Sequence, residues 1–192
     1  MSQFNIHSIQ TAPVTAKPLL EGSLNKYGFV PNLHGGLAES PSALEAYIQL
    51  TALFDKTSLS PTERQVVLLA ASAENHCGYC VAAHSMIARQ MVKIDSNVVD
   101  ALRKRQVLPN PKLDALAIFT RAVVEQRGVV SGKILDDFIA AGYTHQQVLD
   151  VLLGVAMKTL SNYTNHLIDT PLDNAFQSEA LETSGQCSAS CS

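Results

Sequence analysis

Charged residues are scarce in this chain, and basic residues gather nowhere along it. Only 16% of the 192 residues are charged, the net charge at pH 7 is −3, and the six histidines are scattered. Without a basic stripe the chain lacks the surface that nucleic acids bind, so no nucleic-acid partner is expected. The length suits one domain with a substantial core, and so few charges favour a surface partly hidden in an oligomer.

Long apolar runs and a secretory leader are also missing. The opening segment, MSQFNIHSIQTAPVTAKP, has neither a basic start nor an apolar stretch. Apolar runs elsewhere are far shorter than the roughly 20 residues of a membrane span. We therefore expect a cytoplasmic protein without a membrane partner. In the cytoplasm structural disulfides are rare, so a close cysteine pair indicates redox or metal chemistry.

No segment alternates apolar and polar residues as a half-buried strand does, and helix start signals are frequent instead. Serine or asparagine precedes proline in the pairs Ser40-Pro41, Ser60-Pro61 and Asn110-Pro111, which is typical of helix N-termini. Ser131 is a further expected cap, and capping boxes are expected at Ser60/Glu63 and Thr144/Gln147. The pattern predicts an all-α protein in which the apolar run from Val66 to Ala71 is buried on every side.

The composition changes near both ends of the chain. Proline and glycine punctuate residues 1–39, which we expect to form an irregular N-terminal arm with one short helix near Leu19–Tyr27. Residues 40–176 are expected to be the helical domain, with its core at about 40–125. Residues 177–192 are small and serine-rich, and we expect them to form a disordered tail.

Two of the four cysteines stand in the stretch ENHCGYCVAAH, residues 74–84. Cys77, Cys80 and His84 follow the spacing i, i+3, i+7, which places them on one face of a helix running from near residue 76 to residue 91, with Asn75 as its cap. In the first turn Cys77 would meet the positive end of the helix dipole, and His84 would accept the proton of Cys80. One sulfur would attack an oxidant and become a sulfenic acid, and the other would close a disulfide that external thiols reduce.

Two other interpretations of the same residues are possible. Two cysteines at this spacing are half of a zinc site that His84, His76 or His166 would complete, although the chain has no second C-x-x-C and no pair of histidines at zinc-finger spacing. The two thiols are alternatively inert members of a helical core.

The cysteine–histidine stretch, with the apolar segment ERQVVLLAASA before it, resembles the carboxymuconolactone decarboxylase-like superfamily, in particular its alkyl hydroperoxidase D (AhpD)-like, peroxidase-related branch. The segments VPNLHGGLAESPSALEAY and GVVSGKILDDFIAAGYTHQQVLDVLLGVAMKTLSNYTNHLIDTPLD extend the resemblance over residues 28–176. It implies an oligomeric AhpD-like helical fold, often a trimer or hexamer. The implied activity is reduction of a small hydroperoxide, with no bound cofactor and with electrons from an external dithiol donor, in some members a lipoyl-bearing partner protein.

The resemblance also implies roles for individual residues. Cys80 corresponds to the cysteine that attacks the peroxide, Cys77 to its resolving partner and His84 to a proton relay. The relay glutamate of the AhpD-like branch lies twelve residues before the first cysteine, where this chain has Gln65, which carries no carboxylic proton. Glu74 is the alternative relay acid if the turn folds it back, and otherwise it is a solvated loop carboxylate.

Two further groups of residues leave their roles open. Asn162 and His166 are i, i+4 neighbours in a polar segment, and they either reach the thiol pocket or satisfy backbone groups at a helix end. Cys187 and Cys191 are either a mobile dithiol that serves Cys77 and Cys80 or incidental thiols.

Two alternative functions also remain: a decarboxylase acting on a small lactone without cysteine chemistry, and a non-enzymatic zinc-binding or redox-sensing module.

Overall fold

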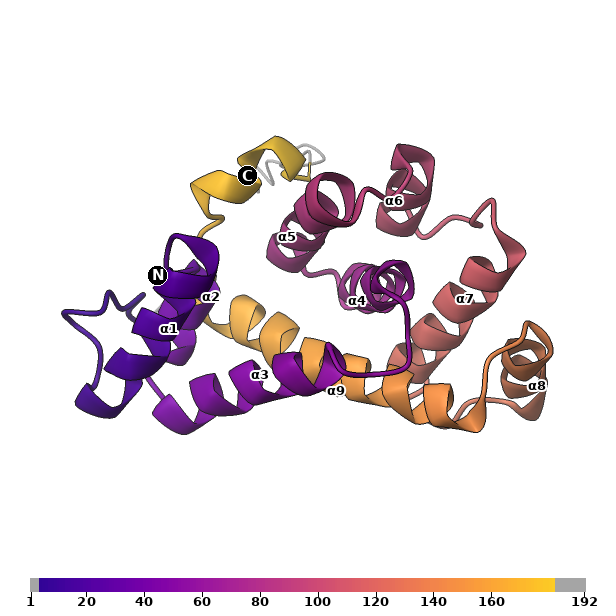
Figure 1. The fold of residues 1–192 in the computed structure, drawn as a ribbon, viewed down its shortest axis with the longest axis horizontal. Coiled ribbons are helices and arrows are strands. Elements are labelled where there is room, and N and C mark those ends of the chain that lie inside the picture. Colours follow the sequence, from indigo (N-terminus) through magenta and orange to yellow (C-terminus); the bar gives the residue numbers. More distant parts are fainter. Residues whose placement is uncertain (1–3, 182–192) are drawn as a thin grey trace, which may run out of the picture.

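The computed structural model describes residues 4–181, and Cys187 and Cys191 lie outside them. These residues form an all-α fold without strands, as the sequence predicts (Figure 1). No helix in this part of the chain is both long enough and apolar enough to cross a membrane. Along the chain the elements are η1 (Val14–Ala16), α1 (Lys17–Tyr27), α2 (Asn32–Leu37), α3 (Pro41–Phe54), α4 (Pro61–Glu74), α5 (Gly78–Met86), the π-helical η2 (Ile87–Val92), α6 (Ser96–Arg103), α7 (Pro111–Glu125), α8 (Gly132–Ala140), α9 (His145–Ile168) and η3 (Asn174–Glu179).

Helix α4 is the centre of the fold. Every residue from Val66 to Ala73 is buried, which confirms the burial predicted for this run. Helices α5, α6, α7 and α9 all pack against α4, and Figure 1 looks almost along its axis. Because apolar neighbours surround it, α4 is a fixed support for the turn that follows it and carries Cys77.

Most of the predicted start signals are confirmed as side-chain caps. In each case a side-chain oxygen accepts a hydrogen bond from a backbone N–H of the first turn, and two helices have the full capping box. The capping residues are Ser40 for α3, Ser60 with Glu63 for α4, Asn110 for α7 and Thr144 with Gln147 for α9. Ser131 precedes α8 as expected, but its side chain makes no capping hydrogen bond.

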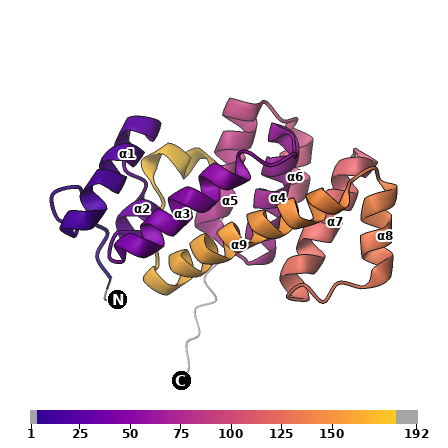
Figure 2. The ribbon, with the colours of Figure 1, turned by 60° about the horizontal axis from the view of Figure 1, so that its bottom comes forward.

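Helix α9 packs against both α3 and α4, and a glycine makes this approach possible (Figure 2). A β-carbon at Gly154 would lie 2.7 Å from Cε2 of Phe54 on α3 and 2.8 Å from Cγ1 of Val67 on α4. Real β-carbons essentially never come so close to other atoms. The small residue therefore lets the long helix lie directly against the core.

The N-terminal arm is more helical than predicted. Helix α1 includes the segment near Leu19–Tyr27 that was expected to be helical, whereas α2 was not expected. Pro31 is the N-cap of α2 in extended conformation, so a residue taken as a sign of irregular structure in fact marks a helix start. Leu20, Leu33 and Leu44 join the arm to α3 in a small apolar cluster of their own.

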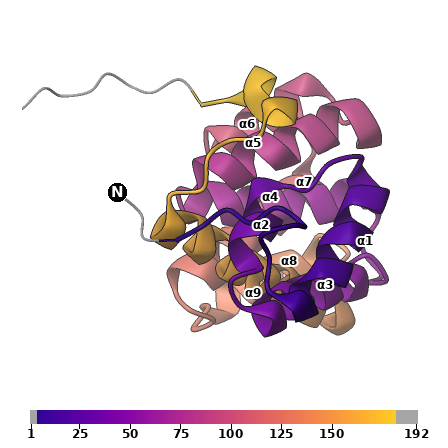
Figure 3. The ribbon, with the colours of Figure 1, turned by 90° about the vertical axis from the view of Figure 1, so that its left-hand side faces the viewer.

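The disordered tail was expected to begin at residue 177, but η3 continues to Glu179 and the structure describes the chain up to residue 181. Residues 170–181, here called the C-terminal strap, contain η3 and lie beside α5 (Figures 1 and 3). Phe176 of the strap is buried, and its ring meets those of Phe29 and Tyr79 edge-on at centroid distances of 6.0 and 5.8 Å. Residues 177–179, which serine-rich composition predicted to be disordered, continue the same short helix η3 after this packed ring.

Candidate functional site

A tight turn between α4 and α5 positions the two cysteines. Helix α4 ends at Glu74 with Asn75 as its C-cap, and Cys77 is the N-cap of α5. The expected helix from near residue 76 therefore starts at Gly78, and Asn75 ends the preceding helix instead of starting this one. Cys80, not Cys77, lies in the first turn of α5, where free N–H groups and the helix dipole favour an anion. After Met86 the chain continues as the π-helical η2, so α5 is shorter than predicted.

Both sulfurs are buried, and polar groups of α9 reach them. Cys77 and Cys80 are free thiols with exposed fractions of 1% and 2%. The amide Nδ2 of Asn165 lies 3.2 Å from Sγ of Cys80 and 3.7 Å from Sγ of Cys77, so it donates to both. Oγ of Ser161 is 3.9 Å from Sγ of Cys80. One amide in contact with both sulfurs shows that the two side chains point to the same side of the turn.

Lys158 supplies the positive charge beside the thiols. It lies on α9 with an exposed fraction of only 1%, and its ammonium group is close enough to Cys80 to lower the pKa of that thiol. A buried ammonium group is strongly disfavoured unless an anion or acceptor compensates it, and a Cys80 thiolate is such an anion. The charge of Lys158 and the sulfur of Cys80 thus stabilise each other.

The two thiols differ in acidity because of these contacts. Burial alone would raise the pKa of the Cys80 thiol, but the hydrogen bond with Cys77 and the Lys158 ammonium group outweigh it and hold that pKa well below its usual value. The same hydrogen bond with Cys80, followed by burial, raises the pKa of the Cys77 thiol. Cys80 is therefore the thiolate of the pair, and Cys77 is the thiol that donates to it.

His84 has a partner on each ring nitrogen. Nδ1 lies 3.1 Å from Oε1 of Gln65, and Nε2 lies 3.2 Å from Nζ of Lys158. An amide oxygen only accepts and an ammonium group only donates, so these partners assign the ring proton to Nδ1 and the lone pair to Nε2. Burial, and then the charge of Lys158, lower the pKa of His84 well below its usual value. The imidazole is therefore neutral, and Lys158 lies between it and the sulfur of Cys80.

Gln65 and Glu74 occupy different places relative to His84. Gln65 is the hydrogen-bond partner of the imidazole, in the position that the resemblance assigns to a relay glutamate. Glu74 instead pairs with Arg105, with 3.7 Å between Oε1 and Nη1. Among the described residues Glu74 makes no hydrogen bond to His84 or to either cysteine, so the turn does not fold it back toward the thiols.

The polar segment at the end of α9 reaches the thiols through other residues than those singled out in the sequence. His166 is exposed, and Asn162 is buried with its Oδ1 3.0 Å from Nδ2 of Asn75. Asn162 therefore ties α9 to the end of α4, while its neighbours Ser161 and Asn165 contact sulfur. Lys158, Ser161 and Asn165 were missed, although their spacing of i, i+3 and i+7 repeats that of Cys77, Cys80 and His84. The sequence feature that could have identified them is a single lysine, Lys158, directly after a long apolar run.

A cavity of about 430 Å³ opens beside His84 and Gln65. Its walls are mainly apolar and include Tyr47, Phe54 and Met157. His84 and Gln65 line it, whereas the cysteines do not. A small molecule in this cavity would thus contact His84 without contacting either sulfur.

A second cavity of about 230 Å³ shares His34 with the first. Nδ1 of His34 lies 2.7 Å from Oγ of Ser23. Burial, and to a smaller extent the charge of Lys26, lower the pKa of His34 to about 4. His34 is therefore a second buried, neutral imidazole next to the larger cavity.

The described residues offer no ready-made metal site. Within residues 4–181 no three side chains of histidine, cysteine, aspartate or glutamate are grouped so that they could hold a metal ion. The zinc interpretation of Cys77 and Cys80 therefore lacks a ligand set in this part of the chain. His76, one of its expected ligands, lies in the turn before Cys77 with a positive φ of 55°.

Solved structures of other proteins have the same fold. A peroxidase-related protein with an alkylhydroperoxidase AhpD core from Ralstonia eutropha JMP134 is 27% identical with a TM-score of 0.79, over 91% of this chain and 94% of the other. A peroxidase-related protein from Silicibacter sp. TM1040 is 16% identical with a TM-score of 0.78, over 92% and 93%. A variant of the debrominase Bmp8 in complex with 2,3,4-tribromopyrrole is 18% identical with a TM-score of 0.78, over 93% and 96%.

A known protein family matches the part of the chain that holds Cys77 and Cys80. No curated protein matches the sequence significantly. Residues 39–122 match the carboxymuconolactone decarboxylase family, and this segment includes α3, α4, α5 and most of α7. Gln65, Cys77, Cys80 and His84 all fall inside it, whereas Lys158 and Asn165 lie beyond it. Residues 39–122 thus resemble the carboxymuconolactone decarboxylase family, and the fold of the chain is AhpD-like.

Proposed function

We propose that the protein reduces hydroperoxides through a dithiol–disulfide cycle of Cys77 and Cys80. The observation that carries the proposal is the environment of Cys80: the amide of Asn165 donates to this sulfur, and the buried Lys158 and the second thiol, Cys77, lower its pKa. Such contacts stabilise a thiolate, which is the nucleophilic form of cysteine. A second thiol within reach is what a sulfenic acid needs in order to close a disulfide.

In the proposed cycle the Cys80 thiolate attacks the terminal oxygen of the hydroperoxide. The O–O bond breaks, the alkoxide takes a proton and leaves as an alcohol, and Cys80 becomes a sulfenic acid. The Cys77 thiol then loses its proton and attacks the Cys80 sulfur, so water leaves and the disulfide forms. An external dithiol donates two electrons and two protons to restore both thiols.

Lys158 and His84 provide the proton path in this proposal. The ammonium group of Lys158 donates to Nε2 of His84, and it lowers the pKa of the Cys80 thiol. A proton released or needed at the sulfur can therefore pass through Lys158, with His84 holding the amine in place. His84 faces the larger cavity, which supports entry of the peroxide from that side. Gln65 orients the imidazole but carries no acidic proton.

The electron donor is proposed to be a dithiol, in free form or on a lipoyl-bearing partner protein. No bound cofactor takes part in the cycle as proposed, because the two sulfurs themselves carry the electrons between peroxide and donor. The burial of Cys77 and Cys80 requires a donor that is narrow enough to reach them or a local opening of the turn.

The test is consumption of an organic hydroperoxide with dithiothreitol as the donor, in the parent protein and in Cys80→Ser. We expect turnover in the parent and none in the variant, with one disulfide per chain after one equivalent of peroxide. An equal rate in Cys80→Ser would rule out the proposed cycle. A muconolactone substrate provides the comparison with the other chemistry of the family, since a decarboxylase that works without cysteines would keep its rate in the same variant.

We also propose that the protein is a homo-oligomer, a trimer or hexamer, with α9 at the contact. Leu149, Leu152, Tyr163 and Leu167 are exposed on α9. Their spacing places them within about 60° of one another around the helix, as a single apolar stripe. Light scattering should give a smaller mass for Leu152→Lys/Leu167→Lys and an unchanged mass for the control Val129→Lys, which changes an exposed residue elsewhere. A parent protein that is monomeric would contradict the proposal.

A further inference from the structure

The larger cavity, next to His84, has walls of the kind to which aromatic molecules bind. Its volume of about 430 Å³ lies within the range of small-molecule sites. Aromatic side chains from distant parts of the chain line it: Tyr27, Phe29, Tyr47, Phe54, Tyr79 and Phe176. Methionines of α5, η2 and α9 line it as well, and their thioether groups adapt to the shape of a ring and contact it favourably. A ring inside the cavity would thus find the edge-to-face and sulfur contacts that aromatic groups prefer.

The buried walls of the cavity carry no charge. Of the described residues that line it, only Lys26 and Asp55 are charged, and both are exposed, so solvent screens them. His34 and His84 are neutral, because burial lowers the pKa of His34 to about 4 and the pKa of His84 well below its usual value. An ion in the cavity would lose its hydration without gaining a counter-charge. The walls therefore favour an uncharged ligand.

His34, which lines the cavity, has one ring nitrogen without a partner. Oγ of Ser23 donates its proton to the backbone carbonyl of Leu19 at 3.0 Å, so it accepts from Nδ1 of His34, 2.7 Å away. The ring proton is therefore on Nδ1, and Nε2 carries the lone pair. No described residue hydrogen-bonds Nε2, yet the atom is not fully enclosed, so a small molecule can reach it. A side chain that is only 6% exposed thus presents a hydrogen-bond acceptor that the described part of the chain does not use.

The imidazole of His34 is held in one orientation, and hydroxyl groups around it already have partners. The rings of Tyr27 and Tyr47 meet the imidazole edge-on at centroid distances of 5.8 and 5.5 Å. The hydroxyl of Thr51 donates to the backbone carbonyl of Tyr47 at 2.9 Å, and the hydroxyl of Tyr79 donates to the C-terminal strap. Nε2 of His34 is therefore an acceptor that a ligand has to supply with a donor.

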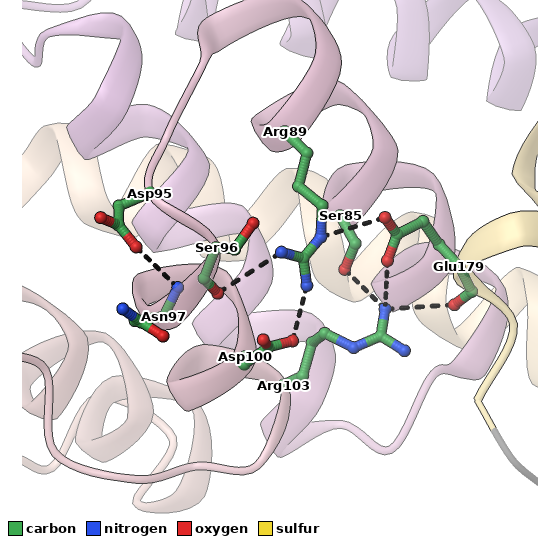
Figure 4. A network of polar contacts seen from close by, with 8 residues as sticks. All are labelled: Ser85, Arg89, Asp95, Ser96, Asn97, Asp100, Arg103 and Glu179. Atoms are coloured by element: carbon green, nitrogen blue, oxygen red, sulfur yellow. Dashed lines mark hydrogen bonds and ion pairs between the residues drawn. The ribbon is translucent and has the colours of Figure 1, made fainter.

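The C-terminal strap forms part of the cavity wall and is held in place by ion pairs. Phe176 of the strap lines the cavity. Three residues later, Oε1 of Glu179 lies 3.0 Å from Nε of Arg89, and its Oε2 lies 3.1 Å from Nη1 of Arg103 (Figure 4). The Glu179 side chain is only 13% exposed, so solvent screens these ion pairs weakly. This wall is thus formed before a ligand arrives, which lowers the cost of binding.

We propose that the cavity binds an uncharged aromatic compound with a hydroxyl group, which donates a hydrogen bond to Nε2 of His34. The walls favour the ring, the lack of buried charge favours the neutral form, and the unused acceptor favours the hydroxyl group. The inference goes beyond the proposed function, because neither cysteine lines the cavity and binding transfers no electrons. His34 sets the specificity, since a buried acceptor left without a donor weakens the binding of a ligand that lacks the hydroxyl group.

The experiment measures dissociation constants by isothermal titration calorimetry at neutral pH in the full-length protein, with 4-methylphenol and 1,4-dimethylbenzene as probes. The two molecules have the same shape, and a methyl group replaces the hydroxyl group in the second. The hydrocarbon leaves water more readily in every case, so the informative quantity is the ratio of the two constants. In His34→Phe, which keeps a ring and removes the acceptor, we expect this ratio to shift by about tenfold in favour of the hydrocarbon. It should not change in the control His145→Phe, at an exposed position.

Two measurements on the parent protein decide the question even if His34→Phe does not fold. In an NMR titration 4-methylphenol should move the ¹⁵N resonance of Nε2 of His34, whereas 1,4-dimethylbenzene should move it much less. The charged analogue 4-methylbenzoate should bind more weakly than 4-methylphenol. The inference would be overturned by a lack of 4-methylphenol binding, an unchanged ratio in His34→Phe, an equal effect of both probes on Nε2, or a benzoate that binds as tightly as the phenol. None of these measurements uses a peroxide, so their outcome is independent of the proposed function.

Discussion

Nζ of Lys158 lies 3.2 Å from Nε2 of His84, and the charge of the same ammonium group lowers the pKa of the Cys80 thiol. The lysine therefore links the imidazole to the reactive sulfur. The imidazole is neutral and positions the amine, and the amine carries the charge. Substitutions around this contact separate these two roles.

Lys158→Met should raise the pKa of the Cys80 thiol, because the variant keeps the volume of the side chain and removes its charge. The second-order rate of Cys80 alkylation at neutral pH should fall by about tenfold or more, since each pKa unit changes the thiolate fraction tenfold. The measurement is the pH profile of alkylation by iodoacetamide, read by mass spectrometry at Cys80. Lys104→Met, at an exposed position, is the control. An unchanged midpoint in Lys158→Met would show that the ammonium group does not stabilise the thiolate.

Asn165→Ala should also weaken the thiolate, since its amide donates to both sulfurs. Hydrogen bonds to charged groups contribute about 1.5–3 kcal/mol, so we expect alkylation at neutral pH to slow by about tenfold. The matched control is His166→Ala, one residue further along α9 and exposed. Equal alkylation rates in the two variants, or a larger loss in His166→Ala, would show that Asn165 does not stabilise the thiolate.

Gln65→Glu should place a carboxylate 3.1 Å from Nδ1 of His84, where the amide oxygen lies now. A carboxylate at this distance stabilises the imidazolium ion, so the pKa of His84 should rise. An NMR titration of the imidazole measures this pKa, with Gln106→Glu at an exposed position as the control. Peroxide turnover should rise with it if proton delivery limits the rate. A titration of His84 identical to that of the parent would contradict the orientation of Gln65 described above.

His34 should make the free energy of unfolding depend on pH. Its pKa is lowered from 6.5 in the unfolded chain to about 4 in the folded protein, so the unfolded chain binds the proton more readily. The stability is therefore full above pH 6.5 and falls as the pH is lowered toward 4, by about 3 kcal/mol in total. Urea unfolding at a series of pH values should show a shallower fall for His34→Asn than for the parent or for His145→Asn, at an exposed position. The lowered pKa of His84 adds to the fall in all three proteins.

The sequence predicted the helical class, most of the capped helix starts and the shared side of Cys77 and Cys80, because each depends on contacts within one helix or turn. It did not predict Lys158 or Asn165, which approach the thiols from α9, more than 70 residues away along the chain. Helical periodicity shows that Lys158, Ser161 and Asn165 share a face, but not which helix that face meets. Ser-rich composition likewise gave no sign of the strap, since the partners of Phe176 and Glu179 (among them Tyr79, Arg89 and Arg103) lie far away along the chain.

Gly154 lies four residues before Lys158, one turn earlier on the same side of α9, at the point where that helix touches Phe54 and Val67. The depth to which the ammonium group enters the protein is thus set by how closely two backbones approach, and not only by the length of the lysine side chain. A single methyl group at residue 154 would push α9 outward and lengthen the path between nitrogen and sulfur. Because residue 154 has no β-carbon, Lys158, one helical turn further along α9, can approach Cys80 and lower the pKa of its thiol.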